Sequence, residues 1–231
     1  AEHDIVFFAD QDDKWLSDKT AALQKVLLET GSAMVYGQSY LIDQNGQVIK
    51  EPKVSGESRE RNLAWLLKKW PSGYQTAFRK SVLTDILQQQ YTDYPGFDYH
   101  DVLFGMLAPL YGKVVCLDQL LDQHRIHQAN VTQSASSLSF NKTRLSRINY
   151  LQKVISRYES VQKIAEEQQI SEADHRQVTK VLALTNLRLK LLQSRNPFWA
   201  LGLMFQIREY RTIKDFISDL VYTLSLIHIS E

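Results

Sequence analysis

The chain has 231 residues, of which 44% are hydrophobic and 23% charged, a composition typical of a globular protein rather than a disordered or membrane-spanning one. A single cysteine, Cys116, excludes an internal disulfide framework, so a reducing cytoplasm is the expected setting. The net charge of +1 divides unevenly, because residues 1–140 hold 13 Lys and Arg against 17 Asp and Glu, whereas residues 141–223 hold 14 against 8.

Strand and helix patterns alternate over residues 1–131 and predict an α/β domain with a mixed sheet. An apolar run from Asp4 to Ala9 predicts a buried strand, and Ser17 is the expected N-cap of a helix that Gly31 ends. Asn45-Gly46 predicts a hairpin between flanking strands. Further strands are predicted at 74–78, 113–117 and 119–124, further helices at 62–70, 81–89 and 101–110, and a polar loop at 52–61.

The pattern changes after Asn130. Residues 132–139 are rich in Ser and predict a linker, and residues 140–223 predict a helical C-terminal region. We expect its apolar segment, Phe198 to Phe205, to pack against the protein, and the alternative is a place in a membrane interface at the inner face of the cell membrane. The interleaved acids of this region argue against a nucleic-acid partner.

Both ends of the chain look irregular. It begins without Met, directly before a predicted strand, and residues 224–231 resemble a translated sequencing adapter. We therefore expect a fragment of a longer protein, in which the octapeptide has no functional role.

The sequence Asp10-Gln11-Asp12-Asp13 follows the first predicted strand. A strand that ends in carboxylates is how an α/β sheet presents ligands to a cation or a phosphate. Carboxylate oxygens suit Mg²⁺ or Mn²⁺, and either ion suits a diphosphate. The alternative is an acidic turn that leads into a helix.

Two further segments carry candidate site residues. Asp101 stands in the first turn of a predicted helix, where the helix dipole favours its ionised form, and an ionised carboxylate can accept a proton from a hydroxyl group. Ser72-Gly73 forms a turn where the backbone can approach a ligand closely. A purely structural cap and a structural turn are the alternatives.

The segment from His124 to Asn130 places two imidazoles, one guanidinium and an amide at a strand end. Arg125 could bind a phosphate through paired donors, and neutral His127 could bind a metal. The spacing of the two histidines is not a zinc signature, because no second Cys or His pair accompanies it. A polar loop after an edge strand is the alternative.

The order of these pieces resembles family 2 glycosyltransferases of the rhamnosyltransferase-like, GT-A type. The matching elements are the strand that ends in Asp-Gln-Asp-Asp before Trp15, the small-residue turn at Ser72, His100-Asp101 at the start of a helix, and Arg125, His127 and Asn130 of the closing motif. The resemblance covers about residues 1–131, which would be the C-terminal part of a GT-A catalytic domain. His124 departs from the pattern, since the family has Tyr there.

This resemblance implies an inverting transfer of a sugar, with rhamnose as a candidate, from a nucleotide diphosphate to a cell-surface polysaccharide or a lipid-linked acceptor. Asp12, with His127, would bind the metal, and Asp101 would be the general base. The donor would be held by a larger group: Asp10, Asp13, Ser72, Gly73, Arg125, His127 and Asn130. The family's first strand and nucleotide-base loop are missing here, so the resemblance implies a chain that is inactive alone.

Two other classes of function stay open. Strand-Asp-x-Asp also begins haloacid-dehalogenase-like phosphatases, with Asp10 as nucleophile and Asp12 as acid, although Lys14 stands where that pattern has Thr or Val. The helical region could instead serve as a non-catalytic interaction module on a degenerate domain.

Overall fold

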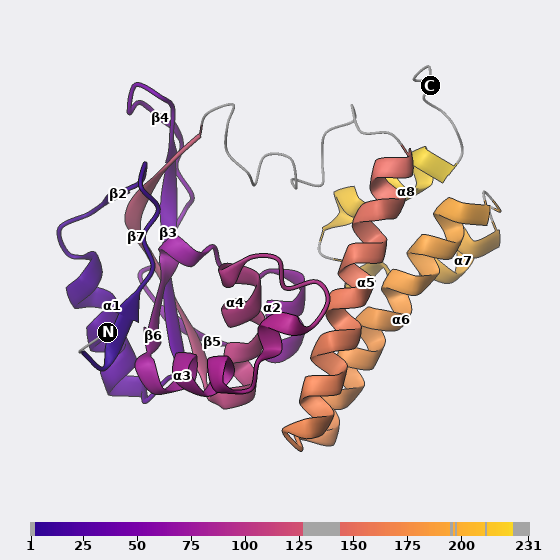
Figure 1. Cartoon of the computed structure of the whole chain (residues 1–231). Coiled ribbons are helices and arrows are strands. Elements are labelled where there is room, and N and C mark those ends of the chain that lie inside the picture. The colour runs from indigo at the N-terminus through magenta and orange to yellow at the C-terminus, as the bar shows by residue number, and fades with distance from the viewer. Residues whose placement is uncertain (1–2, 127–143, 195, 197, 211, 224–231) are drawn as a thin grey trace. The chain divides into compact units, whose positions relative to one another are not determined.

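The structure is a computed structural model that describes residues 3–126, 144–194, 196, 198–210 and 212–223. These residues form two compact units (Figure 1). The first runs to residue 126 without Leu67–Lys69 and Tyr94–Gly96, and the second joins those two segments to the residues from 144 onward. The predicted linker at 132–139 and the octapeptide at 224–231 lie outside the described residues.

Up to residue 126 the chain forms a seven-stranded mixed sheet with helices, which confirms the predicted α/β class. The strands are β1 (Ile5–Phe7), β2 (Lys14–Trp15), β3 (Met34–Ile42), β4 (Val48–Lys50), β5 (Ser58–Arg61), β6 (Thr76–Arg79) and β7 (Val114–Arg125). The helices are α1 (Lys19–Thr30), α2 (Leu63–Lys68), α3 (Lys80–Gln88) and α4 (His100–Tyr111), with short 3-10 turns at η1 (Gly73–Gln75) and η2 (Tyr91–Asp93).

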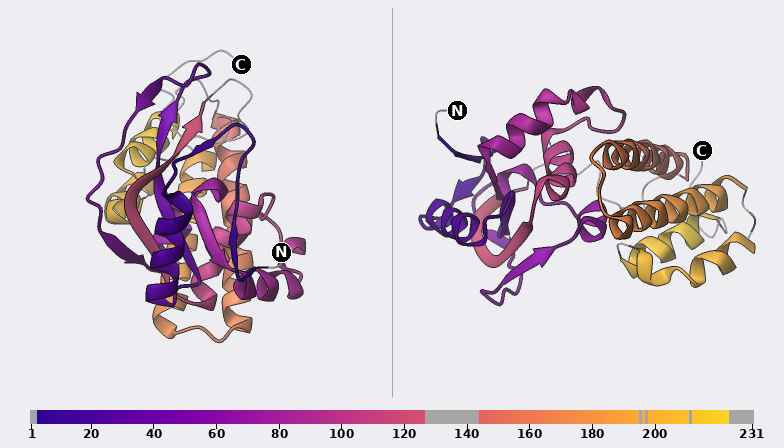
Figure 2. Two further views of the ribbon diagram at one scale, coloured as in Figure 1. Left: turned by 90° about the vertical axis from the view of Figure 1, so that its left-hand side faces the viewer. Right: turned by 90° about the horizontal axis from the view of Figure 1, so that it is seen from below.

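The strand order places three polar segments at one edge of the sheet. The order is β1-β6-β3-β7-β2, in which β6 runs antiparallel to both β1 and β3, and β3 runs parallel to β7. Strands β1, β3 and β7 therefore point the same way, and their carboxyl ends share an edge. Figure 2 shows that β7 curves along its length, and its register with β3 shifts near Gln38.

Each face of this sheet has its own apolar layer, with α1 on one side and α4 on the other (Figure 1). Leu23 and Leu27 of α1 pack in a cluster with Val35 of β3 and Val115 of β7. On the opposite face the rings of Phe8, Phe78 and Phe104 lie within 6.0 Å of one another, centroid to centroid. The two layers fix the end of β1, from which the acidic loop leaves.

Several predicted details change in the structure. β1 is a half-buried edge strand rather than a fully buried one. Asp18, not Ser17, stands at the N-cap position of α1, and its side chain makes no capping hydrogen bond. The expected loop at 52–61 contains β5, because β7 has a free edge there with which it pairs antiparallel. The strands expected at 113–117 and 119–124 are one strand, β7. Gly31 does end α1 in the left-handed conformation, as predicted.

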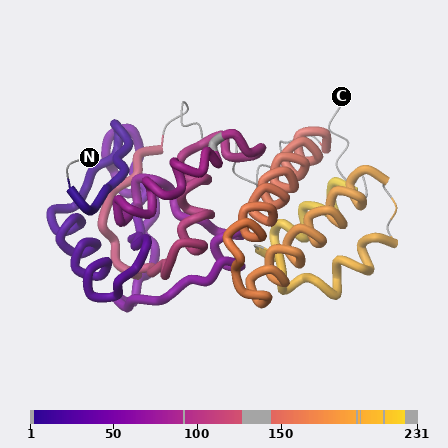
Figure 3. Tube along the Cα trace, turned by 60° about the horizontal axis from the view of Figure 1, so that its bottom comes forward, coloured from indigo at the N-terminus to yellow at the C-terminus, as the bar shows by residue number. Residues whose placement is uncertain are grey.

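The second unit is helical, as the sequence predicts. It contains α5 (Arg144–Glu167), α6 (Glu172–Ser194), α7 (Phe198–Met204), the turn η4 (Ile207–Glu209) and α8 (Ile213–Thr223). The tube in Figure 3 shows α5 and α6 as a long antiparallel pair. Among the helices that the structure describes, none is both long enough and apolar enough to cross a membrane.

A charged cluster lies in the interior of the second unit. Asp219 of α8 is fully buried and binds Arg147 of α5 at 3.1 Å and Arg188 of α6 at 2.6 Å. The Tyr210 hydroxyl donates to the same carboxylate at 3.2 Å. These contacts tie three helices together through one buried anion.

Lys19, the first residue of α1, is fully buried beside the sheet. Its ammonium binds the buried Asp122 carboxylate of β7 at 2.9 Å, donates to the Tyr74 carbonyl, and lies 4.3 Å from the Trp15 ring centre. Burial lowers the pKa of Lys19 and raises the pKa of Asp122, and their mutual attraction opposes both shifts. Removing one partner would leave the other as an uncompensated buried charge.

Replacing Lys19 by Met is expected to lower the free energy of unfolding by about 3–5 kcal/mol, because Asp122 would keep its burial and lose its partner. The control is Lys25→Met, whose ion pair with Glu29 is 3.9 Å long and well exposed, and a loss of about 0.5 kcal/mol is expected there. Urea unfolding measures both. The double variant Lys19→Met, Asp122→Leu should recover most of the loss. Equal losses for Lys19→Met and Lys25→Met would contradict this account.

Candidate functional site

The candidate site lies at the edge where β1, β3 and β7 end. The acidic loop leaves β1, and the chain returns as β2, whose Lys14 and Trp15 pair with Gln123 and Asp122 of β7. This pairing brings the residue before β2, Asp13, beside the residue after Gln123, His124. Residues more than one hundred positions apart in the sequence therefore meet through a two-residue strand.

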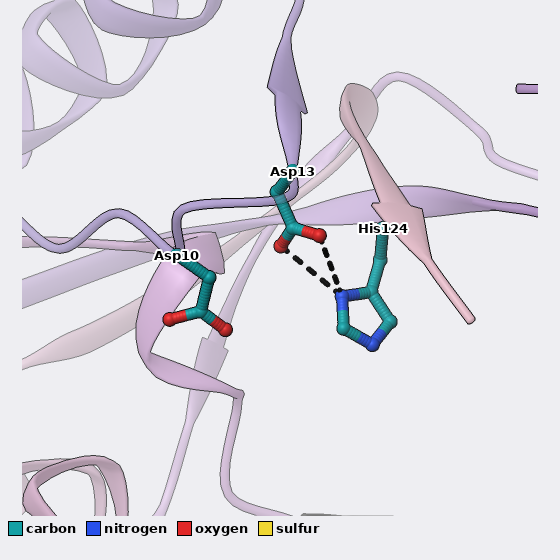
Figure 4. A group of neighbouring side chains, drawn as sticks. All are labelled: Asp10, Asp13 and His124. Atoms are coloured by element: carbon teal, nitrogen blue, oxygen red, sulfur yellow. Dashed lines mark hydrogen bonds and ion pairs between the residues drawn. The ribbon is translucent and has the colours of Figure 1, made fainter. Parts of the chain in front are cut away.

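The Asp13 side chain is fully buried and joins the acidic loop to β7. Its Oδ1 lies 2.9 Å from Nδ1 of His124, its Oδ2 lies 3.1 Å from the same nitrogen, and the Arg125 backbone N–H donates to Oδ1 at 3.0 Å. An ionised carboxylate can only accept, so Nδ1 carries the hydrogen. Figure 4 shows the other ring nitrogen, Nε2, pointing away from Asp13.

Asp10 completes a group that could hold a cation. One ligand atom from each of Asp10, Asp13 and His124 lies within 4.8 Å of the other two, the only such group of three among the described residues. Two carboxylates and one imidazole suit Mn²⁺ and, through the oxygens, Mg²⁺. The hydrogen bond from Nδ1 to Asp13 also orients the ring, as carboxylate–histidine pairs do beside bound metals.

The charges in this group perturb one another. Partial burial and then the neighbouring charge of Asp13 raise the pKa of Asp10, and His124 opposes the shift. Burial alone would lower the pKa of His124, but its hydrogen bond and attraction to Asp13, with help from Asp10 and Asp12, raise it above the usual value. A concentration of negative charge therefore surrounds this imidazole, which favours a cation there.

Tyr74 supports the other face of His124. The two rings stack with centroids 4.4 Å apart and planes 6° from parallel. The carbonyl of Tyr74 accepts from Lys19, which also binds Asp122 two residues before His124. The buried Lys19 thus fixes both Tyr74, which stacks on the imidazole, and β7, which carries the imidazole.

Arg125 ties two loops together at the same edge. Its Nε donates to the Asp12 carbonyl at 3.1 Å, and its Nη1 donates to the carbonyls of Asp43 and Gln44 at 3.1 and 2.7 Å. Asp43 and Gln44 follow β3, so the guanidinium connects the ends of β1, β3 and β7. In this structure Arg125 holds the site's backbone, and its predicted contact with a diphosphate stays a prediction.

The turn at Ser72-Gly73 lies against the start of α4. A Cβ added to Gly73 would stand 2.6 Å from Nε2 of His100 and 3.5 Å from Cβ of Asp101. The His100 ring also contacts Phe8, two residues before Asp10, with centroids 4.9 Å apart. The small residue at 73 therefore serves the packing of His100, which links the predicted base, Asp101, to the acidic loop.

Most of the predicted site residues converge on this edge. Asp10 and Asp13 lie in the group, Asp12 contributes its carbonyl to Arg125, and Ser72, Gly73 and Asp101 form the neighbouring turn and helix start. His127 and Asn130 lie outside the described residues, so the metal pair Asp12 and His127 stays a prediction.

Sequence reasoning missed the part that His124 plays and did not find Tyr74. His124 stood out as one of two imidazoles at a strand end and as a departure from a family pattern, but not as a partner of Asp13. The stacking of a tyrosine fifty residues away has no signal in the sequence, since it depends on how η1 meets β7.

The fold has counterparts among solved structures, although no family model and no curated protein matches the sequence. Residues 1–349 of S. aureus TarS, solved in complex with UDP-GlcNAc, match with a TM-score of 0.50 and 13% identity, over 98% of this chain and 68% of that chain. The fold is of the glycosyltransferase type. The complex of the same TarS segment with UDP gives a TM-score of 0.48 and 14% identity, over 98% and 67% of the two chains. At such low identity the likeness shows the fold alone.

The raised pKa of His124 predicts a pH dependence of folding. The pKa of His124 is higher in the folded state than the unfolded value of about 6.5. The Asp13–His124 attraction therefore contributes its full stabilisation of the folded state below about pH 6.5, and this contribution is lost as the pH rises through the folded-state pKa. The difference in melting temperature between the wild type and His124→Gln, measured against pH without metal, should therefore be largest in mild acid and fall to a smaller, constant value above neutrality. Subtracting the curves cancels the other histidines, and a difference independent of pH would contradict the assignment.

Proposed function

We propose that this protein is a metal-dependent glycosyltransferase that moves a sugar from a nucleoside diphosphate to an acceptor hydroxyl. The observation that carries the proposal is the group formed by Asp10, Asp13 and His124 at the carboxyl edge of a glycosyltransferase-type sheet. The fold likeness to a TarS segment in complex with UDP-GlcNAc supports a donor of the same class, a uridine diphosphate sugar.

The residues at the edge fit a divalent cation, Mn²⁺ or Mg²⁺. Asp10 and the free ring nitrogen of His124 would hold it, with Asp13 bonded to the other ring nitrogen, and with Asp12 and His127 as the further ligands that the motif order suggests. A cation bound there would neutralise the charge of the donor diphosphate and of the leaving nucleotide. The protein's own contribution is rigid placement: Asp13 orients the imidazole, Tyr74 stacks on it, and Arg125 holds the loops.

Asp101 is the proposed general base. It lies in the first turn of α4, where its Oδ1 accepts the Val102 N–H at 2.8 Å, and the neighbouring Gly73 and His100 connect it to the acidic loop. A carboxylate in this position would take the proton of the acceptor hydroxyl as that oxygen attacks the anomeric carbon. One displacement of the nucleoside diphosphate by the attacking oxygen inverts the anomeric configuration.

The finer assignments rest on the order of motifs in the sequence. The proposal includes the rhamnosyltransferase-like subtype, rhamnose as the sugar, and a cell-surface polysaccharide or lipid-linked acceptor. It also includes a cytoplasmic location and contacts of the donor with Ser72, Gly73, Arg125, His127 and Asn130.

The first test separates donor binding from transfer. Titration calorimetry of the chain with UDP-GlcNAc and UDP should show binding that needs Mn²⁺ or Mg²⁺ and is lost with a chelator. Asp10→Asn and His124→Gln should each weaken this binding about 10- to 100-fold, the usual effect of disturbing a metal site. Asp85→Asn, which removes an exposed carboxylate of α3, is the matched control and should bind like the wild type.

The second arm concerns Asp101. In the longer protein that the sequence resemblance implies, Asp101→Asn should leave donor binding intact and slow sugar transfer about 10²- to 10⁴-fold, because it removes only the base. Transfer at an undiminished rate would exclude Asp101 as the base. Metal-independent binding of the nucleotide, or binding unaffected in Asp10→Asn, would exclude the metal-assisted donor site.

A further inference from the structure

Helix α7 exposes an apolar stripe in the second unit. Phe198, Leu201 and Met204 are 76%, 56% and 59% exposed, and Phe205, directly after the helix, is 91% exposed. At 100° per residue Phe198, Leu201 and Met204 fall within about a third of the helix circumference. On the opposite side of α7, Leu203 is fully buried in an apolar cluster that includes Leu184 and Leu191 of α6.

The stripe is not surface that the helical unit needs for its own packing. Leu203 already anchors α7, and the cluster around it is closed by Tyr210 and Phe216. Four large apolar side chains on little more than two turns are more than scattered exposure, and such a patch marks a surface that contacts something else.

The charges around α7 are selectively positive. Between residues 190 and 223 the acids are Glu209, Asp215 and Asp219, and each forms an ion pair inside the second unit, Glu209 with Lys68 and the two aspartates with Arg147. The exposed charges that the structure describes there are Lys190, Arg208 and Lys214. Lys190 of α6 lies 5.7 Å from the ring centre of Trp199 of α7.

Helix α8 repeats this arrangement. Its inner side carries Asp215, Phe216 and Asp219, all buried. Ile213 and Ile217, one turn apart on its outer side, are 63% and 47% exposed, next to the exposed Lys214. Both helices thus combine a buried inner face, an exposed apolar stripe and basic flanks.

We propose that the outer faces of α7 and α8 bind the surface of an anionic lipid bilayer. Apolar stripes with basic flanks on short amphipathic helices lie in the boundary between headgroups and acyl chains, where Phe and Leu insert and Lys and Arg meet lipid phosphates. Pairing every acid of this segment inside the unit removes the charges that an anionic surface would repel. The inference does not depend on the proposed donor site, and its test needs no sugar nucleotide.

The test is co-sedimentation of the full chain with vesicles of phosphatidylcholine mixed with phosphatidylglycerol, and with vesicles of phosphatidylcholine alone. The chain should pellet with the anionic vesicles at low salt, less at high salt, and weakly with the neutral ones. Phe205→Ser and Leu201→Ser should each weaken the binding about tenfold, and Lys214→Gln about fivefold. Leu87→Ser removes a leucine of α3 that is 52% exposed, and this matched control should bind like the wild type.

Three results would overturn the proposal. One is failure to pellet with anionic vesicles at low salt. Another is binding that Phe205→Ser and Leu201→Ser leave unchanged, particularly with lowered melting temperatures, since the stripe would then pack against the protein itself. The third is concentration-dependent self-association, seen by light scattering without lipid and lost in the same variants, which would make the stripe an interface between copies of this chain.

Discussion

The buried carboxylate of Asp13 is the contact on which the candidate site depends. It accepts from the imidazole of His124 and the backbone N–H of Arg125, and so fastens the loop after β1 to the end of β7. A buried carboxylate without such donors would be strongly disfavoured. The short strand β2 follows Asp13 directly and pairs with β7, which continues the same closure. The position of Asp10 relative to His124 follows from that closure.

Further buried polar contacts support the link between the acidic loop and β7. Lys19 binds Asp122, two residues before His124, and donates to the carbonyl of Tyr74, whose ring stacks on the imidazole. Arg125 performs a similar task at the edge, with carbonyls of two loops as its acceptors. Several buried or half-buried charged side chains therefore hold the imidazole of His124 and the carboxylates of Asp10 and Asp13 in place. Such placement matters to a catalyst, whose ligands must be held before the substrate arrives.

Local sequence signals predicted much of this fold. The 3.6-residue patterns of α1 and α4, the left-handed Gly31 and the Asn45-Gly46 turn act over a few residues and appear where expected. The predictions are wrong where pairing between distant segments determines the secondary structure. The example is β5, which forms in a polar segment only because an edge of β7 is available. The site shows the same division. Asp10 and Asp13 were visible as carboxylates after a strand, whereas the stacking of Tyr74 on His124 needs the assembled sheet.

The most direct test of the central claim is a crystal structure of the chain grown with UDP and Mn²⁺. The account predicts an anomalous peak for manganese coordinated by Asp10 and His124, with the diphosphate of UDP on the same ion and Asp13 still bonded to the imidazole. Manganese and UDP bound elsewhere, or UDP bound at this edge with no ion against Asp10, Asp13 or His124, would contradict it.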